Sequence, residues 1–329
     1  MRLQLAWNGQ KIVAAHIAAT RPLAASLLLG QTPERAVALV PRLFSLCGQA
    51  QGVAARLALR AARGESATAE ELERAVCSVA LEAIGEHLWR LLLDWPALLG
   101  QSVRKDAFLS WRKRLLAVSD TSTSALFGAE LKRWLEQEQR HAFEPVLGLM
   151  PALAQSALLP WLSATEWAQQ PIDEAFSKRP HFSGRPAETG VLARQAENAE
   201  VAKLRGAGLG IAARIAARYV DLRDLASGLI APDSLVKWVE AAPCGEACGL
   251  ARVETARGVL LHLIQVRDLK VQRYLIVAPT EWNFHPQGAF VQGIIGVAAT
   301  SQAQAEAAAR RLALALDPCV DIHIEIQEV

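Results

Sequence analysis

The sequence has no excess of charge of one sign and no block of basic residues. Its 35 lysines and arginines are offset by 33 aspartates and glutamates, which leaves a net charge of +2. A nucleic-acid-binding protein usually carries a larger and clustered positive excess, because it must neutralise phosphates. The near balance argues against a nucleic-acid partner and predicts a roughly neutral surface.

The sequence also lacks an apolar run of the kind that membranes or secretion signals require. Met1–Leu5 carries one positive charge, but no apolar stretch of signal-peptide length follows it. The longest uncharged stretch, Pro145–Thr165, is about as long as a membrane helix but contains three prolines. We therefore expect a cytoplasmic protein with no membrane insertion.

Cysteines are too few and too scattered for a disulfide framework. There are five of them, and with no export signal we expect reduced thiols. Cys244 and Cys248 lie in a segment that resembles a flexible loop and that could bind a metal. Zinc sites generally need four ligands, however, and no second pair with suitable spacing follows. The favoured interpretation of this pair is therefore incidental cysteines.

Apolar residues are abundant and mostly follow helical periods. They make up 52% of the chain, slightly above the usual globular share, which is ample for a large core. Thr68 and Glu71 form a capping box that predicts the start of a long helix running to Trp95. The glycine repeat Gly206–Gly210 is interpreted as a softened part of a helix. Further helices are predicted over residues 33–40, 52–63, 106–118, 124–140, 191–226 and 301–316.

Strands are predicted near both ends of the sequence. The alternation of Leu3, Leu5 and Trp7 up to Asn8-Gly9 predicts a hairpin with a type I′ turn. The alternation over 320–327 predicts a half-buried strand. Three further β-rich runs cover residues 251–254, 258–266 and 270–277.

These patterns together predict a single domain over residues 1–329, of the mainly α (α+β) class. Its helical core is expected over about 30–230 and its β-rich part over about 249–280. A C-terminal helix and strand are expected over 301–329.

Four short stretches, in order along the chain, resemble the large subunit of nickel–iron hydrogenases. Gly30–Cys47 reads GQTPERAVALVPRLFSLC and is similar to that family's G-R-x-P-x-x-A-x-x-x-x-x-R-I-C-G-x-C. Glu254–Leu260 reads ETARGVL and is similar to E-A-P-R-G-x-L. Val277–Asn283 reads VAPTEWN, similar to V-x-P-T-T-W-N, and Leu316–Cys319 reads LDPC, similar to F-D-P-C-x-x-C. The resemblance implies the large-subunit fold, a helical-bundle core with a small β-sheet portion near the C-terminus.

Departures from the family's pattern decide what function the resemblance implies. The catalytic subunit holds nickel and iron with four cysteines in two C-x-x-C pairs. Here Cys47 and Cys319 remain, while Phe44 and Ile322 occupy the other two positions. Gln51 stands where the family has a histidine. Nickel in this setting needs thiolate donors, and phenylalanine and isoleucine cannot coordinate a metal. We therefore expect no nickel site and no working hydrogenase.

The remaining positions match those that contact iron and its cyanide ligands in the family. Arg257, Pro279 and Thr280 match the cyanide-binding residues. A guanidinium or hydroxyl group suits this ligand because a cyanide nitrogen is a partly anionic acceptor. Cys47 matches an iron-bound thiolate, whereas Cys319 matches a thiolate that touches only nickel, so a contact between Cys319 and iron stays open. The structural alternatives are a plain buried thiol at Cys47, where the adjoining Arg42 favours a ligand role, and a turn arginine at Arg257.

This combination is similar to the HupK/HoxV type of hydrogenase assembly protein, which resembles the large subunit without being catalytic. The resemblance implies a maturation scaffold that transiently carries iron with cyanide and carbonyl ligands. Its implied partners are the accessory proteins that assemble this iron unit and the apo hydrogenase large subunit. Two alternatives stay open: a degenerate but redox-active hydrogenase subunit, and a metal-free mimic that docks accessory chaperones.

Overall fold

The computed structural model describes residues 1–18, 24–138 and 156–329 of the chain. Two expectations fall partly outside these ranges: the end of the helix predicted over 124–140, and residues 145–155 of the long uncharged stretch. Within the described residues, no helix is both long enough and apolar enough to cross a membrane.

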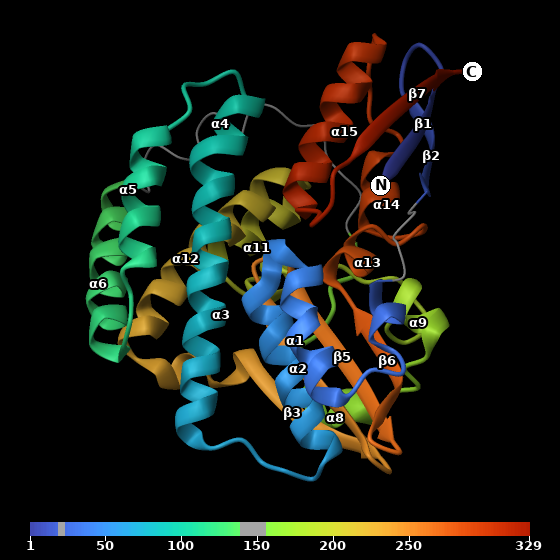
Figure 1. The fold of residues 1–329 in the computed structure, drawn as a ribbon. Helices are drawn as coiled ribbons and strands as arrows, with labels where there is room; N and C mark the ends of the chain where they lie inside the picture. The colour runs from blue at the N-terminus through green and yellow to red at the C-terminus, as the bar shows by residue number, and fades with distance from the viewer. Residues whose placement is uncertain (19–23, 139–155) are drawn as a thin grey trace.

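Helices form most of the molecule, with the long helices α3 and α12 on one side and the strands on the other (Figure 1). The α-helices are α1 (Pro33–Leu43), α2 (Gly48–Ala62), α3 (Ala69–Trp89), α4 (Trp95–Leu98), α5 (Lys105–Leu116), α6 (Thr121–Glu138), α8 (Ala164–Ala168), α9 (Glu174–Lys178), α10 (Val191–Arg194), α11 (Ala199–Gly206), α12 (Gly210–Ile230), α13 (Pro279–Asn283), α14 (Ala289–Ile294) and α15 (Gln302–Leu316). The shorter turns are the 3-10 segments η1 (Ala24–Leu28), η2 (Ser45–Cys47) and η4 (Pro232–Trp238), and the π-helical turn η3 (Arg90–Asp94).

Helix α3 begins where its capping pattern predicts. The Thr68 hydroxyl accepts a hydrogen bond from the Glu71 backbone, and the Glu71 carboxylate accepts one from the Thr68 backbone. Two of the four N–H groups left free at a helix start are thereby satisfied. The helix continues through η3 into α4, which begins at Trp95.

The stretch 191–226, predicted as one helix, is divided into α10, α11 and α12. The Asn198 side chain caps α11 by accepting from the backbone N–H groups of Glu200 and Val201. Gly208 then adopts a φ of +76°, a left-handed conformation that glycine adopts without strain and that ends a helix. The interpretation of a softened helix is therefore wrong, because the glycines separate two helices.

A three-stranded sheet joins the first and last strands of the described chain. Its order is β2 (Ile12–Ala18), β1 (Arg2–Trp7) and β7 (His323–Glu328); β1 is antiparallel to β2 and parallel to β7. The predicted hairpin is confirmed, but its type I′ turn is wrong. That turn needs a positive φ at both central residues, and of Asn8 and Gly9 only Gly9 has one. The predicted strand over 320–327 is also shorter at its start.

A four-stranded antiparallel sheet runs in the order β3 (Val239–Gly245), β4 (Cys248–Thr255), β5 (Gly258–Arg267) and β6 (Lys270–Val277). The last three confirm the predicted β-rich runs, whereas β3 was not predicted. The segment interpreted as flexible is the β3–β4 hairpin, and it places the sulfurs of Cys244 and Cys248 2.8 Å apart.

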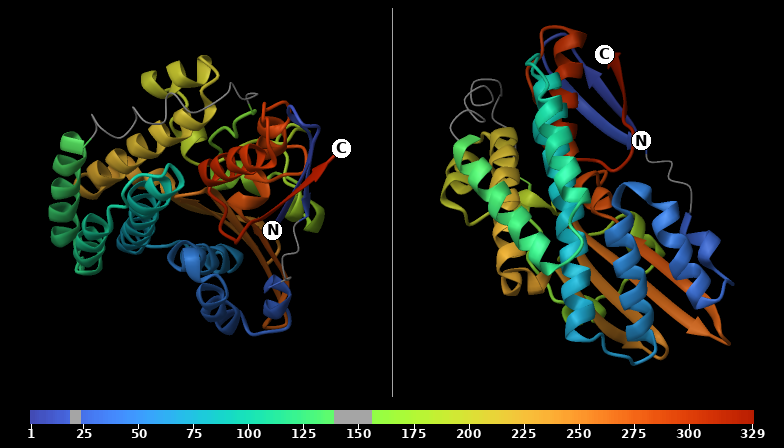
Figure 2. Two further views of the ribbon diagram at one scale, coloured as in Figure 1. Left: turned by 90° about the horizontal axis from the view of Figure 1, so that it is seen from above. Right: turned by 60° about the vertical axis from the view of Figure 1, so that its left-hand side comes forward.

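Helix α2 covers one face of this sheet, and the segment containing α8 and α9 covers the other (Figure 2). Every residue of β4 is buried as a result, as expected for a strand packed on both faces. At Gly249 the helix backbone approaches very closely: an added Cβ would lie 2.1 Å from the carbonyl oxygen of Ala58. This close packing fixes the position of α2, and with it Cys47 at the helix start.

Candidate functional site

Cys47 and Cys319 lie at junctions between helices and less regular segments. Cys47 ends η2 and directly precedes α2, while Cys319 follows the end of α15 by three residues. Both thiols are partly buried. The Sγ of Cys319 lies 3.0 Å from the Oγ1 of Thr280, and its backbone N–H donates to the same oxygen at 3.3 Å. Pro279, also buried, directly precedes Thr280 at the start of α13.

Cys319 is close enough to Cys47 for its charge to act on the Cys47 thiol. Burial raises the pKa of Cys47 to about 12, and the negative charge of Cys319 acts in the same direction. A hydrogen bond from Gln51 and the positive charge of Arg257 oppose this rise. Cys319 and Arg257 are therefore near enough to Cys47 to act on its charge, although they are far apart in the sequence.

Arg257 lies in the tight turn between β4 and β5 and is almost fully buried. Its Nη2 donates to Glu86 at 2.6 Å, and its Nε lies 3.4 Å from Asp317 Oδ1. Burial opposes the charge on this guanidinium, but the carboxylates of Asp317 and Glu86 outweigh it and raise the pKa of Arg257. Arg42, which the sequence placed beside Cys47, is exposed on α1 instead. The arginine that acts on Cys47 thus comes from the sheet.

Asp317 anchors this arginine and the segment that leads to Cys319. It ends α15 with a left-handed φ of +54°. Its carboxylate accepts from Arg90 Nε and Arg218 Nη1, each at 2.8 Å, in addition to the ion pair with Arg257. Burial alone would raise the pKa of Asp317, but the three arginines hold it far below its usual value. The carboxylate is therefore charged at neutral pH.

A buried polar network continues from Asp317 away from the cysteines. Arg218 Nη1 lies 3.1 Å from His87 Nδ1, and His87 Nε2 lies 2.8 Å from Asp221 Oδ2. Because an arginine only donates, Nδ1 accepts and the histidine proton is on Nε2. Burial lowers the pKa of His87 to about 4, so the ring is neutral. Arg194 then joins Asp221 to Glu254 at 2.8 and 2.6 Å.

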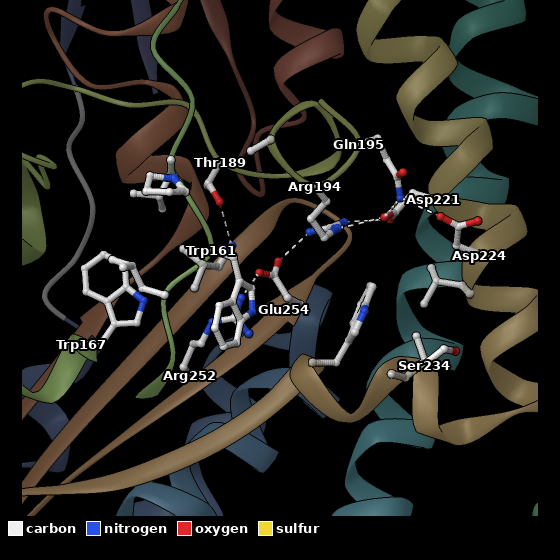
Figure 3. Close-up of a pocket in the computed structure, with 18 of the residues that line it drawn as sticks. Trp161, Trp167, Thr189, Arg194, Gln195, Asp221, Asp224, Ser234, Arg252 and Glu254 are labelled. Carbon is white, nitrogen blue, oxygen red and sulfur yellow. Dashed lines mark hydrogen bonds and ion pairs between the residues drawn. The ribbon is translucent and has the colours of Figure 1, made fainter. Parts of the chain in front are cut away.

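Glu254 and Arg194 line a cavity of about 440 Å³, which the sequence did not predict. Figure 3 shows Arg194 bridging Asp221 and Glu254 at its wall, with Trp161 and Arg252 nearby. The buried charged groups on that wall pair with one another, Arg194 with Asp221 and Glu254, and Arg252 with Glu254, which accounts for their burial on structural grounds. The exposed Asp224 accepts a hydrogen bond from Gln195.

Sequence reasoning also missed a second hydrogen-bonded chain, which ends at Cys47. Gln51 Nε2 lies 3.5 Å from Cys47 Sγ, and Gln51 Oε1 lies 2.9 Å from His262 Nε2. His262 Nδ1 is in turn 2.9 Å from the hydroxyl of Tyr274. The helical spacing of Cys47 and Gln51 predicts the first contact, but His262 is 211 residues away from Gln51 in an apolar β-run.

A large groove, of about 1230 Å³, opens onto the candidate site. Cys319, Arg257 and Glu86 line it on one side, while Leu46, Trp89 and Leu116 contribute exposed apolar side chains. Cys319 and Arg257 are therefore reachable from solvent through this groove.

The potential metal donors near Cys47 and Cys319 are few. Across the part of the chain that the structure describes, no group of three or more histidine, cysteine or acidic side chains could hold a metal ion. Phe44 and Ile322 pack instead against the apolar core. Two thiols, Cys47 and Cys319, with a guanidinium and a hydroxyl nearby, are the groups that the site offers.

Proteins of a known family are similar to this sequence along most of its length. It is 33% identical to the hydrogenase expression/formation protein HupK of Rhizobium leguminosarum bv. viciae, over 92% of this chain and 89% of the relative. It is 34% identical to HoxV of Cupriavidus necator, over 95% and 93% respectively. The chain belongs to the HupK/HoxV family of hydrogenase expression/formation proteins. The resemblance seen in the four sequence motifs is thereby confirmed.

The fold of this HupK/HoxV family member is that of a hydrogenase large subunit. A model of the nickel-dependent hydrogenase family matches residues 217–323, which include Arg257, Thr280 and Cys319. The reduced, active Ni-Fe-Se hydrogenase of Desulfomicrobium baculatum has a TM-score of 0.69 over 96% of this chain and 95% of that one, at 14% identity. The predicted fold class, a helical core with a small sheet portion, is confirmed.

Proposed function

We propose that this protein is a non-catalytic scaffold in nickel–iron hydrogenase maturation. Its cargo is an iron carrying two cyanide ligands and one carbonyl ligand, which it passes to the apo large subunit without ever holding nickel. The observation that carries the proposal is the composition of the site. The charges of Cys319 and Arg257 act on Cys47, and Thr280 contacts Cys319, which supports a shared site for these four residues. Phe44 and Ile322 stand where the family has its other two cysteines, and they pack against the apolar core.

Each group of the site has a task that follows from its chemistry. Thiolates are good ligands for iron, and Cys47 and Cys319 are the sulfur donors that the site offers. Cyanide nitrogens accept hydrogen bonds, and the Arg257 guanidinium and the Thr280 hydroxyl are the donors beside them. Arg257 is held from two sides by Glu86 and Asp317, so its N–H groups keep a fixed direction.

The same site is suited to release. Because the pKa of Cys47 is raised to about 12, a proton competes strongly with a metal for this sulfur at neutral pH. Loading must displace that proton and unloading takes it back, which makes transfer reversible. Four thiolates would hold the iron more firmly and hinder its transfer.

The partners in this scheme are the accessory proteins that assemble the iron–cyanide unit and the apo large subunit that receives it. We place the exchange in the cytoplasm. The groove beside Cys319 and Arg257 provides the path, because it connects the site to solvent. The relatives named expression/formation proteins support the accessory role.

The test is infrared spectroscopy of the protein purified without oxygen from cells that express the maturation machinery. We expect cyanide and carbonyl bands in the wild type and their loss in Cys47→Ala. Cys77→Ala is the matched control, because Cys77 is also partly buried but its sulfur contacts Ser124 on α6. Bands that persist in Cys47→Ala contradict the ligand role of this cysteine.

Two further outcomes identify the alternatives. If no bands appear while hydrogenase maturation still requires the protein, the metal-free docking role is correct. If metal analysis finds nickel bound with the iron, the degenerate hydrogenase subunit is correct.

A further inference from the structure

Gln51 is a buried amide whose two ends have different partners. It lies one helical turn after Cys47, and only 3% of its surface is exposed. Side chains four residues apart share a helix face, so Gln51 extends beside the Cys47 sulfur. A buried amide needs partners for both its oxygen and its nitrogen, and His262 and Cys47 provide them.

His262 determines which end of the amide faces the sulfur. Burial lowers the pKa of His262 to about 3, so the ring is neutral, with one donor nitrogen and one acceptor nitrogen. The Tyr274 hydroxyl beside Nδ1 is also buried, and burial raises the pKa of Tyr274, so the phenol keeps its proton. With Tyr274 donating to Nδ1, the ring proton is on Nε2 and is donated to Gln51 Oε1.

The opposite polarity conflicts with a metal-bound Cys47. If Tyr274 accepted from Nδ1, then Nε2 would accept from the Gln51 amide nitrogen, and Oε1 would face Cys47. A carbonyl oxygen and a thiolate are both hydrogen-bond acceptors, so placing them side by side with no proton between them is unfavourable. A thiolate at Cys47 therefore selects the polarity in which each hydrogen bond points toward the sulfur.

We propose that Gln51 is a positioning residue that donates an N–H to the metal-bound thiolate of Cys47, and that His262 and Tyr274 hold its amide in this orientation. The inference rests on the proposed function in that it assigns Cys47 a metal. A hydrogen bond to a ligating sulfur withdraws electron density from it and weakens its donation to the metal. The chain from Tyr274 to Cys47 thus keeps the cargo exchangeable while the sulfur stays in place.

Cobalt(II), a spectroscopic probe of thiolate ligands, tests this without the natural cargo. The full-length protein carries Cys244→Ser and Cys248→Ser, so that the hairpin thiols do not bind the probe. We expect a thiolate-to-cobalt charge-transfer band that requires Cys47. In Gln51→Leu this band should move to lower energy, because the unprotected sulfur is the better electron donor.

Two further variants separate an electronic role from simple packing. Gln49→Leu makes the same change at an exposed position of α2 and should leave the band unmoved. Tyr274→Phe removes only the hydroxyl that orients His262, and should shift the band in the same direction but less. Melting temperatures of the three variants show whether each is folded, and a purely structural role would lower them without moving the band.

An unmoved band in a folded Gln51→Leu, or the absence of any cobalt band that requires Cys47, overturns the inference. The carbonyl stretch of the iron-loaded protein distinguishes this failure from that of the proposed function. If the iron-loaded Gln51→Leu variant shows the same infrared bands as the wild type, the scaffold function is supported and the role of Gln51 is contradicted. If the cobalt band shifts in Gln51→Leu but the protein never shows iron bands, the role of Gln51 stands and the proposed scaffold function fails.

Discussion

The hydroxyl of Thr280 lies 3.0 Å from the sulfur of Cys319, although 39 residues separate them. Thr280 is the second residue of α13, which follows strand β6 after Ala278, and Cys319 follows α15. Two of the motifs shared with hydrogenase large subunits, VAPTEWN and LDPC, therefore meet through this contact and through Asn283 Nδ2, which donates to Leu316 O at 3.3 Å. The contact fixes the sulfur beside a hydroxyl suited to an iron-bound cyanide.

Replacing Thr280 with valine, which keeps the shape and removes the hydroxyl, tests this contact. The Cys319 backbone N–H loses its acceptor, and we expect the free energy of unfolding to fall by about 1–2 kcal/mol. In the iron-loaded protein the cyanide bands should shift and weaken, as measured by infrared spectroscopy. Thr165→Val, at an exposed position of α8, is the control and should change neither quantity. Unchanged cyanide bands in Thr280→Val would remove this residue from the site.

Asp317→Asn should be among the most destabilising single changes near the site. It leaves Arg90, Arg218 and Arg257 without their shared buried carboxylate, and breaking a buried ion pair costs about 3–5 kcal/mol. Denaturant unfolding measures the loss. Asp321→Asn makes the same change at an exposed position four residues later, and should stay within about 0.5 kcal/mol of the wild type. Equal effects of the two substitutions would contradict the anchoring role of Asp317.

The stability of the protein should fall as the pH is lowered below about 6.5, because buried neutral histidines resist protonation. The pKa of His87 is about 4 in the folded protein, against an ordinary value of 6.5. Between these values the unfolded chain binds a proton that the folded protein does not, so stability rises with pH in this window. The slope that this one residue contributes is at most about 1.4 kcal/mol per pH unit.

The comparison that isolates this effect is His87→Gln, which keeps a polar side chain that does not titrate. Unfolding free energies measured from pH 7 to pH 4 should fall less steeply in the variant than in the wild type. His323→Gln is the control, because His323 is exposed on β7 and should leave the slope unchanged. Parallel pH curves for the wild type and His87→Gln would contradict the buried neutral state of His87.

Gly249→Ala should destabilise the packing of α2 on the sheet. The added methyl group would lie 2.1 Å from Ala58 O and 2.3 Å from Ala62 N, so the helix must move away. Overpacking of this kind costs about 1–3 kcal/mol or more. Thermal unfolding measures the effect, and Gly206→Ala, where an added Cβ meets no neighbour, should be close to neutral. A wild-type melting temperature in Gly249→Ala would show that α2 has room to shift.

Features of the fold with local signals were predicted well from the sequence. Helix α3 begins at the predicted capping box of Thr68 and Glu71, and the helices predicted from residues 33 and 301 are found as α1 and α15. Thr32 and Ser301 cap these two helices, because each side chain accepts a hydrogen bond from the backbone N–H three residues later. Strand β3 was missed because Ala241, Ala242 and Pro243 have low strand propensity. Its pairing with β4 stabilises the strand conformation that these residues do not favour on their own.

The candidate site came from motifs rather than from periodicity. Cys47, Cys319, Arg257 and Thr280 were selected by resemblance, and no sequence pattern indicates that these four meet. The contact between Gln51 and His262 was beyond prediction, because a histidine in an apolar strand gives no sign of which distant helix faces it. Long-range polar pairs depend on the packed structure as a whole.

The pairing of β1 with β7 sets an order of events during synthesis. β1 is the first strand to be made and β7 is the last of the described strands, and the segment carrying Cys319 lies immediately before β7. Until β7 has been made, one edge of β1 has no partner, and the stretch around Cys319 is tethered on one side alone. Cys47, by contrast, is made early with α2. Both sulfurs are therefore available together only after Cys319 has been made, so any cargo that needs both must arrive after that point of translation.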